Sequence, residues 1–253
     1  MPLAITRNIS PRFSECEITH IERTPIDLNL ARAQHCDYVD ALKNLGCEVM
    51  ELPAEPDLAD SVFVEDTAVV LPEVAVITRP GADSRKPETE SIVRLLEPLT
   101  RLVQLQKPAT LDGGDVLVMG KNIFVGYSTR SNQEAIDQLN VLLGEYGYST
   151  TGVHLHDCLH LKTAVSRVDD KTLLINRNWV DSSHFNEFSL IDVDPSEPFA
   201  ANCLPIGGMI LYPTAFPSTR TRLEKAGYPV VTVDVSELAK AEGAVTCCSL
   251  ILP

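Results

Sequence analysis

The last residues of the sequence are Val245-Thr246-Cys247-Cys248-Ser249-Leu250-Ile251-Leu252-Pro253, and the rest of the chain is interpreted around this stretch. It carries no charge, and its β-branched and apolar side chains predict a strand over 245–252. Chain ends usually fray, so an apolar strand at the end is expected to be held inside a sheet. A thiol at the mouth of such a strand is a candidate nucleophile.

Size and composition indicate one self-supporting globular unit. Hydrophobic residues make up 44% of the 253 residues, enough for a core without disulfides or metals. No run approaches the roughly 18 apolar residues that span a bilayer, and the N-terminus lacks the pattern of a secretory signal. We therefore expect a single domain over 1–253, no membrane partner and a cytoplasmic location.

Charge and cysteine content narrow the partners. The formal net charge of -14 argues against nucleic acid, because a phosphate backbone requires a basic footprint. An acidic protein is compatible with a cationic small-molecule substrate. The seven cysteines are an odd number without a CxxC motif, so reduced thiols in a cytosolic protein are expected.

Hydrophobic periodicity predicts strands and helices along the whole chain. We expect helices at 28–45, 87–96, 132–146, 218–226 and 237–242, and a short one near 181–188. Ser131 is the expected N-cap of the third helix, in a capping box with Glu134. The expected strands are 2–6, 47–52, 62–64, 68–71, 74–78, 101–105, 116–118, 123–127, 149–155, 161–168, 172–175, 209–212, 228–235 and 245–252.

This order gives an α/β protein of about five units of strand, strand, helix and strand, each roughly 45–50 residues long. On spacing alone an ordinary α/β sandwich is nearly as good an interpretation.

Two acidic segments stand out as candidate sites. In Asp112-Gly113-Gly114-Asp115 the paired glycines allow close backbone approach to a neighbour or ligand, although a tight turn with solvated acids is the commoner case. In the second segment, a strand period of two would place Asp60 and Asp66 on one face with two valines. Such a pair suits a guanidinium, and solvation at a sheet edge explains it equally well.

Other candidates are a histidine and two arginines. His160 lies between leucines, where a histidine is usually structural. His154, His156 and Cys158 precede it and form a weaker metal-site candidate. Arg85 and Arg130 lie in expected loops, where they are either solvated or hold a substrate carboxylate. A thiol, a histidine, several acids and two arginines together suit covalent catalysis on an amidine-like carbon.

Six segments resemble those of the dimethylarginine dimethylaminohydrolases, a family of guanidino-group-modifying enzymes. They occur in the family's order from about residue 18 to the C-terminus. They are 63–66 (FVED), 78–81 (TRPG), 110–116 (TLDGGDV), 159–162 (LHLK), 200–203 (AANC) and 246–249 (TCCS).

The resemblance implies a pentein fold, with five ββαβ units around a pseudo-fivefold axis and the active site in the central channel. It implies hydrolysis of asymmetric dimethylarginine, and of monomethylarginine, to citrulline and dimethylamine or methylamine. The reaction would pass through a cysteine S-alkylthiouronium intermediate, without cofactor or metal. The partner would be this small molecule, and the protein a monomer or homodimer.

The resemblance also assigns roles to individual residues. Cys247 matches the nucleophile, His160 the general acid and base, and Asp112 the carboxylate that orients this histidine. Cys248 is expected to face the other side of the strand and to pack in the core.

Seven further positions match the substrate site: Ile18, Asp60, Glu65, Asp66, Arg85, Arg130 and Thr163. Asp60 and Asp66 would hold the guanidinium, with Glu65 beside them, and the arginines would clamp the α-carboxylate. Ile18 would belong to a mobile lid, and Thr163 would lie near the histidine.

Alternative functions remain open at this point. Arginine deiminases and amidinotransferases use related residues, but their chains are usually longer. A non-catalytic pentein that binds a macromolecule is an alternative of another class. For the enzyme, a thiol is mostly protonated at neutral pH, and the neighbouring acids disfavour the thiolate further. We therefore expect the cationic substrate to promote ionisation of Cys247.

Overall fold

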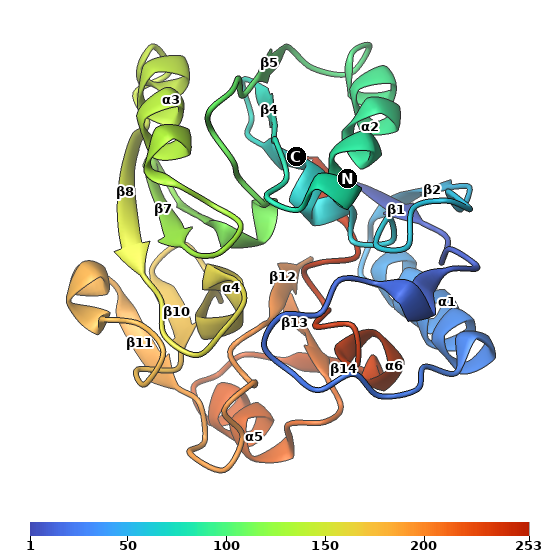
Figure 1. Cartoon of the computed structure of the whole chain (residues 1–253). Helices are drawn as coiled ribbons and strands as arrows, with labels where there is room; N and C mark the ends of the chain where they lie inside the picture. The colour runs from blue at the N-terminus through green and yellow to red at the C-terminus, as the bar shows by residue number, and fades with distance from the viewer. Residues whose placement is uncertain (253) are drawn as a thin grey trace.

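The computed structural model describes residues 1–252, and its strands form five small sheets arranged in a ring (Figure 1). Each sheet has three strands. The middle strand always runs antiparallel to one neighbour and parallel to the other. This repetition confirms the expected five ββαβ units and excludes the ordinary sandwich.

Four of the sheets are formed from consecutive strands. They are β3 (Ala68–Val70), β4 (Ala75–Ile77) and β5 (Leu102–Gln104); β6 (Val116–Met119), β7 (Asn122–Tyr127) and β8 (Ser149–His154); β9 (Val165–Arg167), β10 (Thr172–Ile175) and β11 (Ser189–Asp192); and β12 (Leu204–Ile206), β13 (Met209–Pro213) and β14 (Val230–Val233).

The fifth sheet joins the two ends of the chain, which lie close together in Figure 1. β15 (Leu250–Leu252) runs antiparallel to β1 (Leu3–Arg7), and β1 runs parallel to β2 (Glu48–Leu52). The C-terminal strand thus provides the first strand of the N-terminal unit and closes the ring. The prediction that the last stretch is held in a sheet is confirmed; Pro253 lies outside the described residues.

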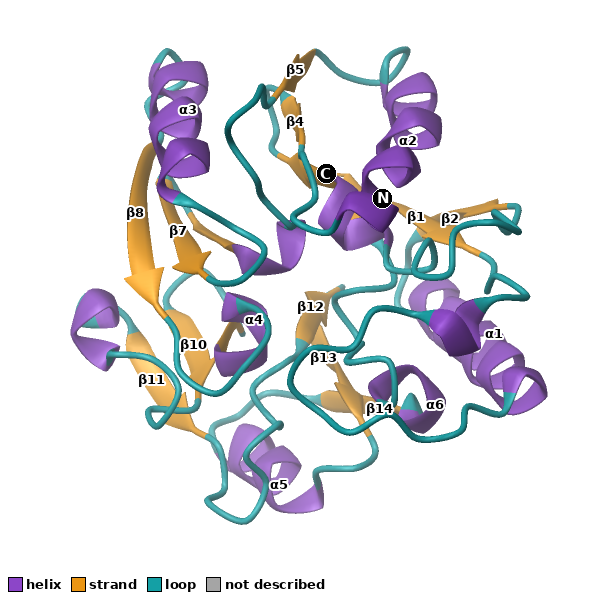
Figure 2. Ribbon diagram, viewed as in Figure 1, coloured by secondary structure: helices purple, strands orange, loops and turns teal. Residues whose placement is uncertain are grey.

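The four longer helices lie on the outside of the ring (Figure 2). α1 (Leu28–Asn44), α2 (Thr89–Leu96), α3 (Gln133–Gly144) and α5 (Pro217–Lys225) each connect the second and third strands of a unit. In the remaining unit the 3-10 turn η5 (Ser182–Phe185) takes this position. The other short elements are η1 (Phe13–Glu15), η2 (Val64–Thr67), η3 (Asp83–Glu88), η4 (Gly113–Asp115), α4 (Leu161–Ala164) and α6 (Ser236–Ala239).

Three predicted strands are wrong where they approach the centre of the ring. Residues 62–64 form a turn that leads into η2, residues 161–164 form α4, and residues 245–248 form a turn before β15. Their backbone groups bond to distant segments: the Glu65 N–H donates to the Cys247 carbonyl at 3.1 Å, and the Leu161 N–H donates to Asp115 at 3.0 Å. Tertiary contacts thus override the β propensity of these segments. The acids of 60–66 therefore share a site without sharing the face of a strand.

Two helix starts also differ from the prediction. The N-cap of α3 is Asn132, whose side chain accepts a hydrogen bond from the Ala135 N–H. The Ser131 hydroxyl instead donates to Asp115 at 2.6 Å, inside the protein. The helix expected from residue 87 begins as η3, and α2 follows from Thr89.

Candidate active site

A short turn precedes the first strand of every unit, and these turns carry most of the candidate residues. Because the units surround one axis, the turns converge at the centre of the ring (Figure 1). From the five turns come Glu65 and Asp66 before β3, Asp112 before β6, His160 before β9, Asn202 before β12 and Cys247 before β15.

Two cavities meet at Cys247 and His160, which line both of them. The larger, here called the apolar cavity, has a volume of about 270 Å³, and its apolar lining includes Ile21, Leu159, Phe199, Pro213, Phe216 and Val235. The smaller, here called the charged cavity, has a volume of about 20 Å³ and is lined by Glu17, Asp60, Asp66, Arg85, Asp112 and Arg130.

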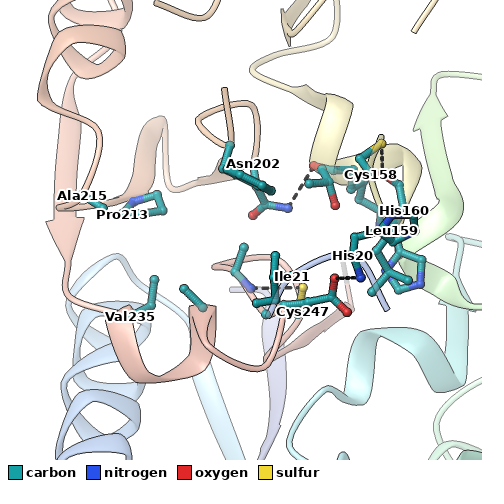
Figure 3. A pocket seen from close by; sticks show the side chains of 18 of the residues that line it. His20, Ile21, Cys158, Leu159, His160, Asn202, Pro213, Ala215, Val235 and Cys247 are labelled. Carbon is teal, nitrogen blue, oxygen red and sulfur yellow. Dashed lines mark hydrogen bonds between the residues drawn. The ribbon is translucent and has the colours of Figure 1, made fainter. Parts of the chain in front are cut away.

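Figure 3 shows how the apolar cavity extends away from the reactive residues. His160 and Leu159 lie at one end, and Pro213, Ala215 and Val235 lie at the other. Cys247 lies between the two ends, so a group bound to its sulfur borders on apolar space (Figure 3).

The turn that carries Cys247 is fixed by hydrogen bonds from three segments. The Ala244 N–H donates to Sγ of Cys247 at 3.3 Å, and the Glu65 N–H donates to the Cys247 carbonyl at 3.1 Å. The hydroxyl of the buried Tyr38 in α1 donates to the Val245 carbonyl at 2.8 Å. The cysteine is thereby held half-buried at the junction of the cavities.

The surroundings of Cys247 keep its thiol protonated. Burial raises the pKa of Cys247 to about 12, and the carboxylates of Glu65 and Asp66 act in the same direction. The Ala244 N–H and Lys162 oppose this rise without reversing it. A bound cation would lower the thiol pKa, which supports the expectation that the substrate promotes ionisation.

His160 is oriented by a buried carboxylate. Its Nε2 lies 3.2 Å from Oδ2 of Asp112, and Asp112 is fully buried. The other oxygen of Asp112 accepts from the Gly81 N–H at 2.9 Å, while the Asp112 N–H donates to Ser131 Oγ at 3.2 Å. The ring is therefore held by a group that is itself fixed from two sides.

The same acids set the protonation of His160. Burial disfavours the imidazolium, but the carboxylates of Asp66, Asp115 and Asp112 together outweigh it and raise the pKa of His160 to about 9. At neutral pH the imidazolium therefore predominates, ready to donate a proton to a leaving amine.

Asp115 is a positioning residue that had no assigned role in the sequence analysis. It is fully buried and accepts from Ser128 Oγ at 2.5 Å, Ser131 Oγ at 2.6 Å and the Leu161 N–H at 3.0 Å. Burial raises the pKa of Asp115 to about 6, against the opposing effect of His160 and both serines. Because Asp115 holds the backbone next to His160, it helps to position that side chain. In the sequence, Asp115 is recognisable as the second acid of the Asp112-Gly113-Gly114-Asp115 turn.

Gly114 explains why that turn needs glycine. A Cβ at this position would lie 2.5 Å from Nδ1 of His160 and 2.9 Å from Oδ1 of Asp66. The Gly114 N–H also donates to Oδ1 of Asp66 at 2.8 Å. Close approach of the backbone, and not a positive φ, is the requirement here.

Arg85 lines the charged cavity but is already paired with protein carboxylates. Nη1 lies 2.6 Å from Oδ2 of Asp66, and Nη2 lies 2.8 Å from Oε2 of Glu88 and donates to the Phe63 carbonyl at 3.1 Å. Burial opposes ionisation of Asp66, but Arg85, His160 and the Gly114 N–H outweigh it and lower the pKa of Asp66 to about 2. Asp66 is thus held as an anion. The ion pair of Arg85 with Glu88 is not predicted by the sequence.

Asp60 and Arg130 connect the charged cavity to the loop at 17–21. Both oxygens of Asp60 accept from the Glu17 N–H, at 3.1 and 3.2 Å. The Arg130 guanidinium donates to Thr19 Oγ1 at 3.1 Å. Both predicted substrate-binding residues therefore face the cavity and hold its cover.

Glu242 fastens the same loop from a distant part of the chain and was missed by sequence reasoning. Its carboxylate accepts from the Thr19 N–H at 2.7 Å and from the His20 N–H at 2.8 Å. Its backbone has a φ of 58°, a left-handed conformation that a non-glycine residue adopts only when its surroundings require it. The two hydrogen bonds that the Glu242 carboxylate accepts from the loop are one such requirement. No local sequence motif marks Glu242.

Two of the predicted residues lie at the margin of the site. Thr163 is half-buried and lines the apolar cavity. Ile18 is half-buried and packs against the core cluster that contains Phe13. The residues of this loop that line the cavities are Glu17, His20 and Ile21.

A polar network supports the turn that carries Cys247. Glu65, predicted to lie beside the guanidinium, accepts from Thr246 Oγ1 at 2.8 Å and forms an ion pair with Lys162. Asn202 accepts from the Thr246 N–H at 3.1 Å and donates to the Lys162 carbonyl at 3.1 Å. Lys162, Asn202 and Thr246 belong to the segments that carry the family resemblance. Their contacts connect the turns before β3, β9, β12 and β15.

Metal-type geometry occurs once within residues 1–252. Ligand atoms of Asp66, Asp112 and His160 lie within 4.8 Å of one another. The cation of Arg85 already pairs with Asp66 at 2.6 Å, which disfavours a second cation there. The other candidate cluster is not of this type: His154 stacks on Tyr127, with ring centroids 4.7 Å apart.

Sequence comparisons find one family profile and relatives that carry the same protein name. Residues 18–252 match the profile of the family described as N,N dimethylarginine dimethylhydrolase, eukaryotic. The N(G),N(G)-dimethylarginine dimethylaminohydrolase of Streptomyces coelicolor is 39% identical over 251 residues, or 98% of this chain and 96% of the relative. The Pseudomonas aeruginosa protein of the same name is 34% identical over 226 residues, or 88% and 89%.

Structural comparison agrees. The P. aeruginosa enzyme, solved as a cysteine-to-serine variant with citrulline, has a TM-score of 0.94 at 31% identity and covers 99% of this chain and 98% of its own. The N-terminal domain of ArgZ, solved with a covalently bound reaction intermediate, has a TM-score of 0.84 at 19% identity, over 100% and 98%. The second likeness bears on the fold alone. Together they confirm the expected pentein fold.

Proposed function

Because the chain belongs to the dimethylarginine dimethylaminohydrolase family, we propose that it hydrolyses Nω,Nω-dimethyl-L-arginine to L-citrulline and dimethylamine through a covalent adduct on Cys247. Nω-Monomethyl-L-arginine gives citrulline and methylamine in the same way. The observation that carries this proposal is the meeting of Cys247 with the His160–Asp112 pair at the edge of a charged cavity.

The charged cavity suits the amino-acid end and the guanidinium of this substrate. Asp66 and Asp60, with Glu65 beside them, supply negative charge for the guanidinium. Arg130 and Arg85 supply positive charge for the α-carboxylate. Arg85 already bonds two carboxylates, so Arg130 carries the larger part of this contact.

The first half of the reaction forms the adduct. The bound cation stabilises the thiolate of Cys247, and the thiol proton leaves to solvent. Sγ then attacks the guanidinium carbon and forms a C–S bond. The imidazolium of His160 donates its proton to the dimethylamino nitrogen, the C–N bond breaks, and dimethylamine leaves an S-alkylthiouronium.

The second half releases the product. His160, now neutral, takes a proton from water, and the resulting hydroxide attacks the same carbon. The C–S bond breaks with the electron pair on sulfur, the proton of the added hydroxyl passes to this thiolate, and citrulline leaves with the thiol of Cys247 restored. Asp112 holds the ring in one orientation for both proton transfers, and Asp115 fixes the backbone beside it.

A citrulline assay tests the proposal, with dimethylarginine, monomethylarginine and arginine compared under the same conditions. We expect turnover of both methylated substrates and its loss in Cys247→Ser. Turnover of arginine alone would indicate a deiminase, and no turnover of any guanidine would favour a binding protein.

We further propose a cytoplasmic monomer or homodimer that acts as one domain over 1–253 and binds no nucleic acid. All seven cysteines are unpaired thiols, which suits a reducing compartment. Within the described residues, no helix has both the length and the apolar character needed to cross a membrane. The net charge of -14 opposes contact with a phosphate backbone.

A further inference from the structure

The apolar cavity is larger than the methyl groups of the proposed substrates require. Its volume is about 270 Å³, whereas an apolar cavity of about 150 Å³ is enough to bind benzene. Two methyl groups at the guanidinium would therefore leave most of this space unfilled.

The walls of this cavity are fixed by packing outside the 17–21 loop. Phe199 lies edge-on to Trp179, with ring centroids 4.8 Å apart. Phe216 lies in the same way near the fully buried Tyr212, with centroids 6.3 Å apart. Phe199 is nevertheless 44% exposed, so a large apolar side chain faces the open space instead of the core. With Ile21, Phe216 and Val235 it forms a concave, mostly apolar lining, which is typical of a ligand pocket.

The charged groups that line the apolar cavity are already engaged. Glu65 is ion-paired with Lys162, and Glu242 accepts two backbone hydrogen bonds from the loop. The amino-acid end of a substrate would find no available counter-charge from these groups. In the charged cavity, Arg130 donates to a neutral group, the Thr19 hydroxyl, so its charge remains available for a carboxylate. The opposite end of the substrate, the N-substituent, then points toward the apolar cavity.

On the basis of the proposed function, we propose that the apolar cavity is a binding subsite for apolar N-substituents larger than methyl. The substrate class then includes Nω-propyl- and Nω-benzyl-L-arginine. The chemistry is unchanged: the C–S bond to Cys247 forms, the C–N bond to the substituted nitrogen breaks, and His160 protonates the departing alkylamine. Water then releases citrulline.

The test compares kcat/KM for Nω-methyl-, Nω-propyl- and Nω-benzyl-L-arginine by citrulline formation. We expect the wild-type value for the benzyl substrate to lie within about tenfold of that for the methyl substrate. Ala239→Leu, at the end of α6, adds carbon atoms inside the cavity. It should lower the benzyl-to-methyl ratio by at least about tenfold. Each ratio is measured on one sample, so loss of folded protein does not affect it.

A second cavity-filling variant and a control variant test whether the ratio depends on the volume of the apolar cavity. Ala215→Leu fills the cavity from another wall (Figure 3) and should lower the ratio in the same direction. Ala33→Leu makes the same change at an exposed position of α1, outside the lining of either cavity, and should leave the ratio unchanged. Methyl turnover without benzyl turnover, or a ratio unaffected by both filling variants, would overturn the subsite and leave the proposed function intact. Absence of methyl turnover would overturn both.

Discussion

The charged cavity and the apolar cavity share one cysteine but are built in opposite ways. In the charged cavity, Asp66 and Arg85 already bond each other at 2.6 Å, and Asp60 holds the backbone of the covering loop. Its volume of about 20 Å³ has room for about one water molecule. We therefore expect the 17–21 loop to move when an amino-acid end enters. The apolar cavity, at about 270 Å³, needs no such movement.

This difference divides the work of recognition. Directional bonds in the charged cavity reject a ligand that leaves a buried ion without a partner, since such a loss is costly. The apolar cavity forms no directional bonds with an alkyl group and discriminates only by size. For the proposed substrates, we therefore expect strict recognition of the shared amino-acid end and loose recognition of the N-substituent. Substitutions at the junction of the two cavities should therefore have larger effects than substitutions in the charged cavity.

The largest effect is expected at the shared cysteine. Cys247→Ser should lower kcat for dimethylarginine by at least about 10⁴-fold, because it removes the nucleophile. Cys248→Ser is the matched control: Cys248 is fully buried, and its Sγ lies 3.8 Å from the Ala244 carbonyl. It should change kcat by only a few-fold. The reverse pattern would show that the other sulfur reacts.

A large effect is also expected from the backbone beneath His160. Gly114→Ala places a methyl group 2.5 Å from the histidine ring and should lower kcat by about 10²-fold, since displacement of a reacting group by about 1 Å has this effect. Gly144→Ala in α3 meets nothing within 4 Å. It should leave kcat unchanged and raise the free energy of unfolding by about 0.5–1 kcal/mol. Full activity in Gly114→Ala would contradict the close approach described here.

Asp66→Asn should act in opposite directions on two measurements. Turnover of dimethylarginine should fall by about tenfold or more, because the guanidinium loses an anionic partner. Alkylation of Cys247 by iodoacetamide at neutral pH should become faster, because a carboxylate that raises the thiol pKa has been removed. In the wild type, alkylation should keep rising through pH 9, below the thiol pKa of about 12. Slower alkylation in the variant, or a wild-type plateau below pH 8, would contradict this account; the exposed Asp83→Asn serves as control.

The smallest effect is expected at the cover of the charged cavity. Glu242→Gln weakens the two hydrogen bonds to the 17–21 loop and should raise KM by roughly three- to tenfold, with less effect on kcat, since hydrogen bonds to charged groups contribute about 1.5–3 kcal/mol. Hydrogen exchange of the Thr19 and His20 amides should become faster. Glu224→Gln, on the exposed face of α5, should change neither. An unchanged KM together with unchanged exchange would remove Glu242 from the account.

Much of the fold follows from local patterns. The helices α1 and α3 bury one face each, so their apolar periodicity marks them, and the regular spacing of strands gives five units. β11 and β12 escaped prediction because each has three or four residues and lies near polar residues or proline. For the turns before β3, β9 and β15 the local sequence predicts strands, because their actual shape depends on distant bonds, such as that between Thr246 and Asn202.

The same distinction applies to the site. The motif residues Cys247, His160 and Asp112 could be identified in the sequence, because the resemblance fixes them one by one. Glu242 could not, since its partner Thr19 is 223 positions away and no periodicity connects them. The internal pairing of Arg85 with Glu88 is likewise a property of packing. Local sequence patterns do not predict the contacts that packing forms between distant parts of the chain.

The central claim is that the sulfur of Cys247 forms a bond to the substrate carbon. The most direct test mixes the enzyme with Nω,Nω-dimethyl-L-arginine, quenches with acid within one turnover and maps the adduct by fragmentation mass spectrometry of the C-terminal peptide. We expect an S-alkylthiouronium on Cys247, absent from Cys247→Ser and still present in Cys248→Ser. An adduct on Cys248, or citrulline formed without a cysteine adduct at any quench time, would contradict it.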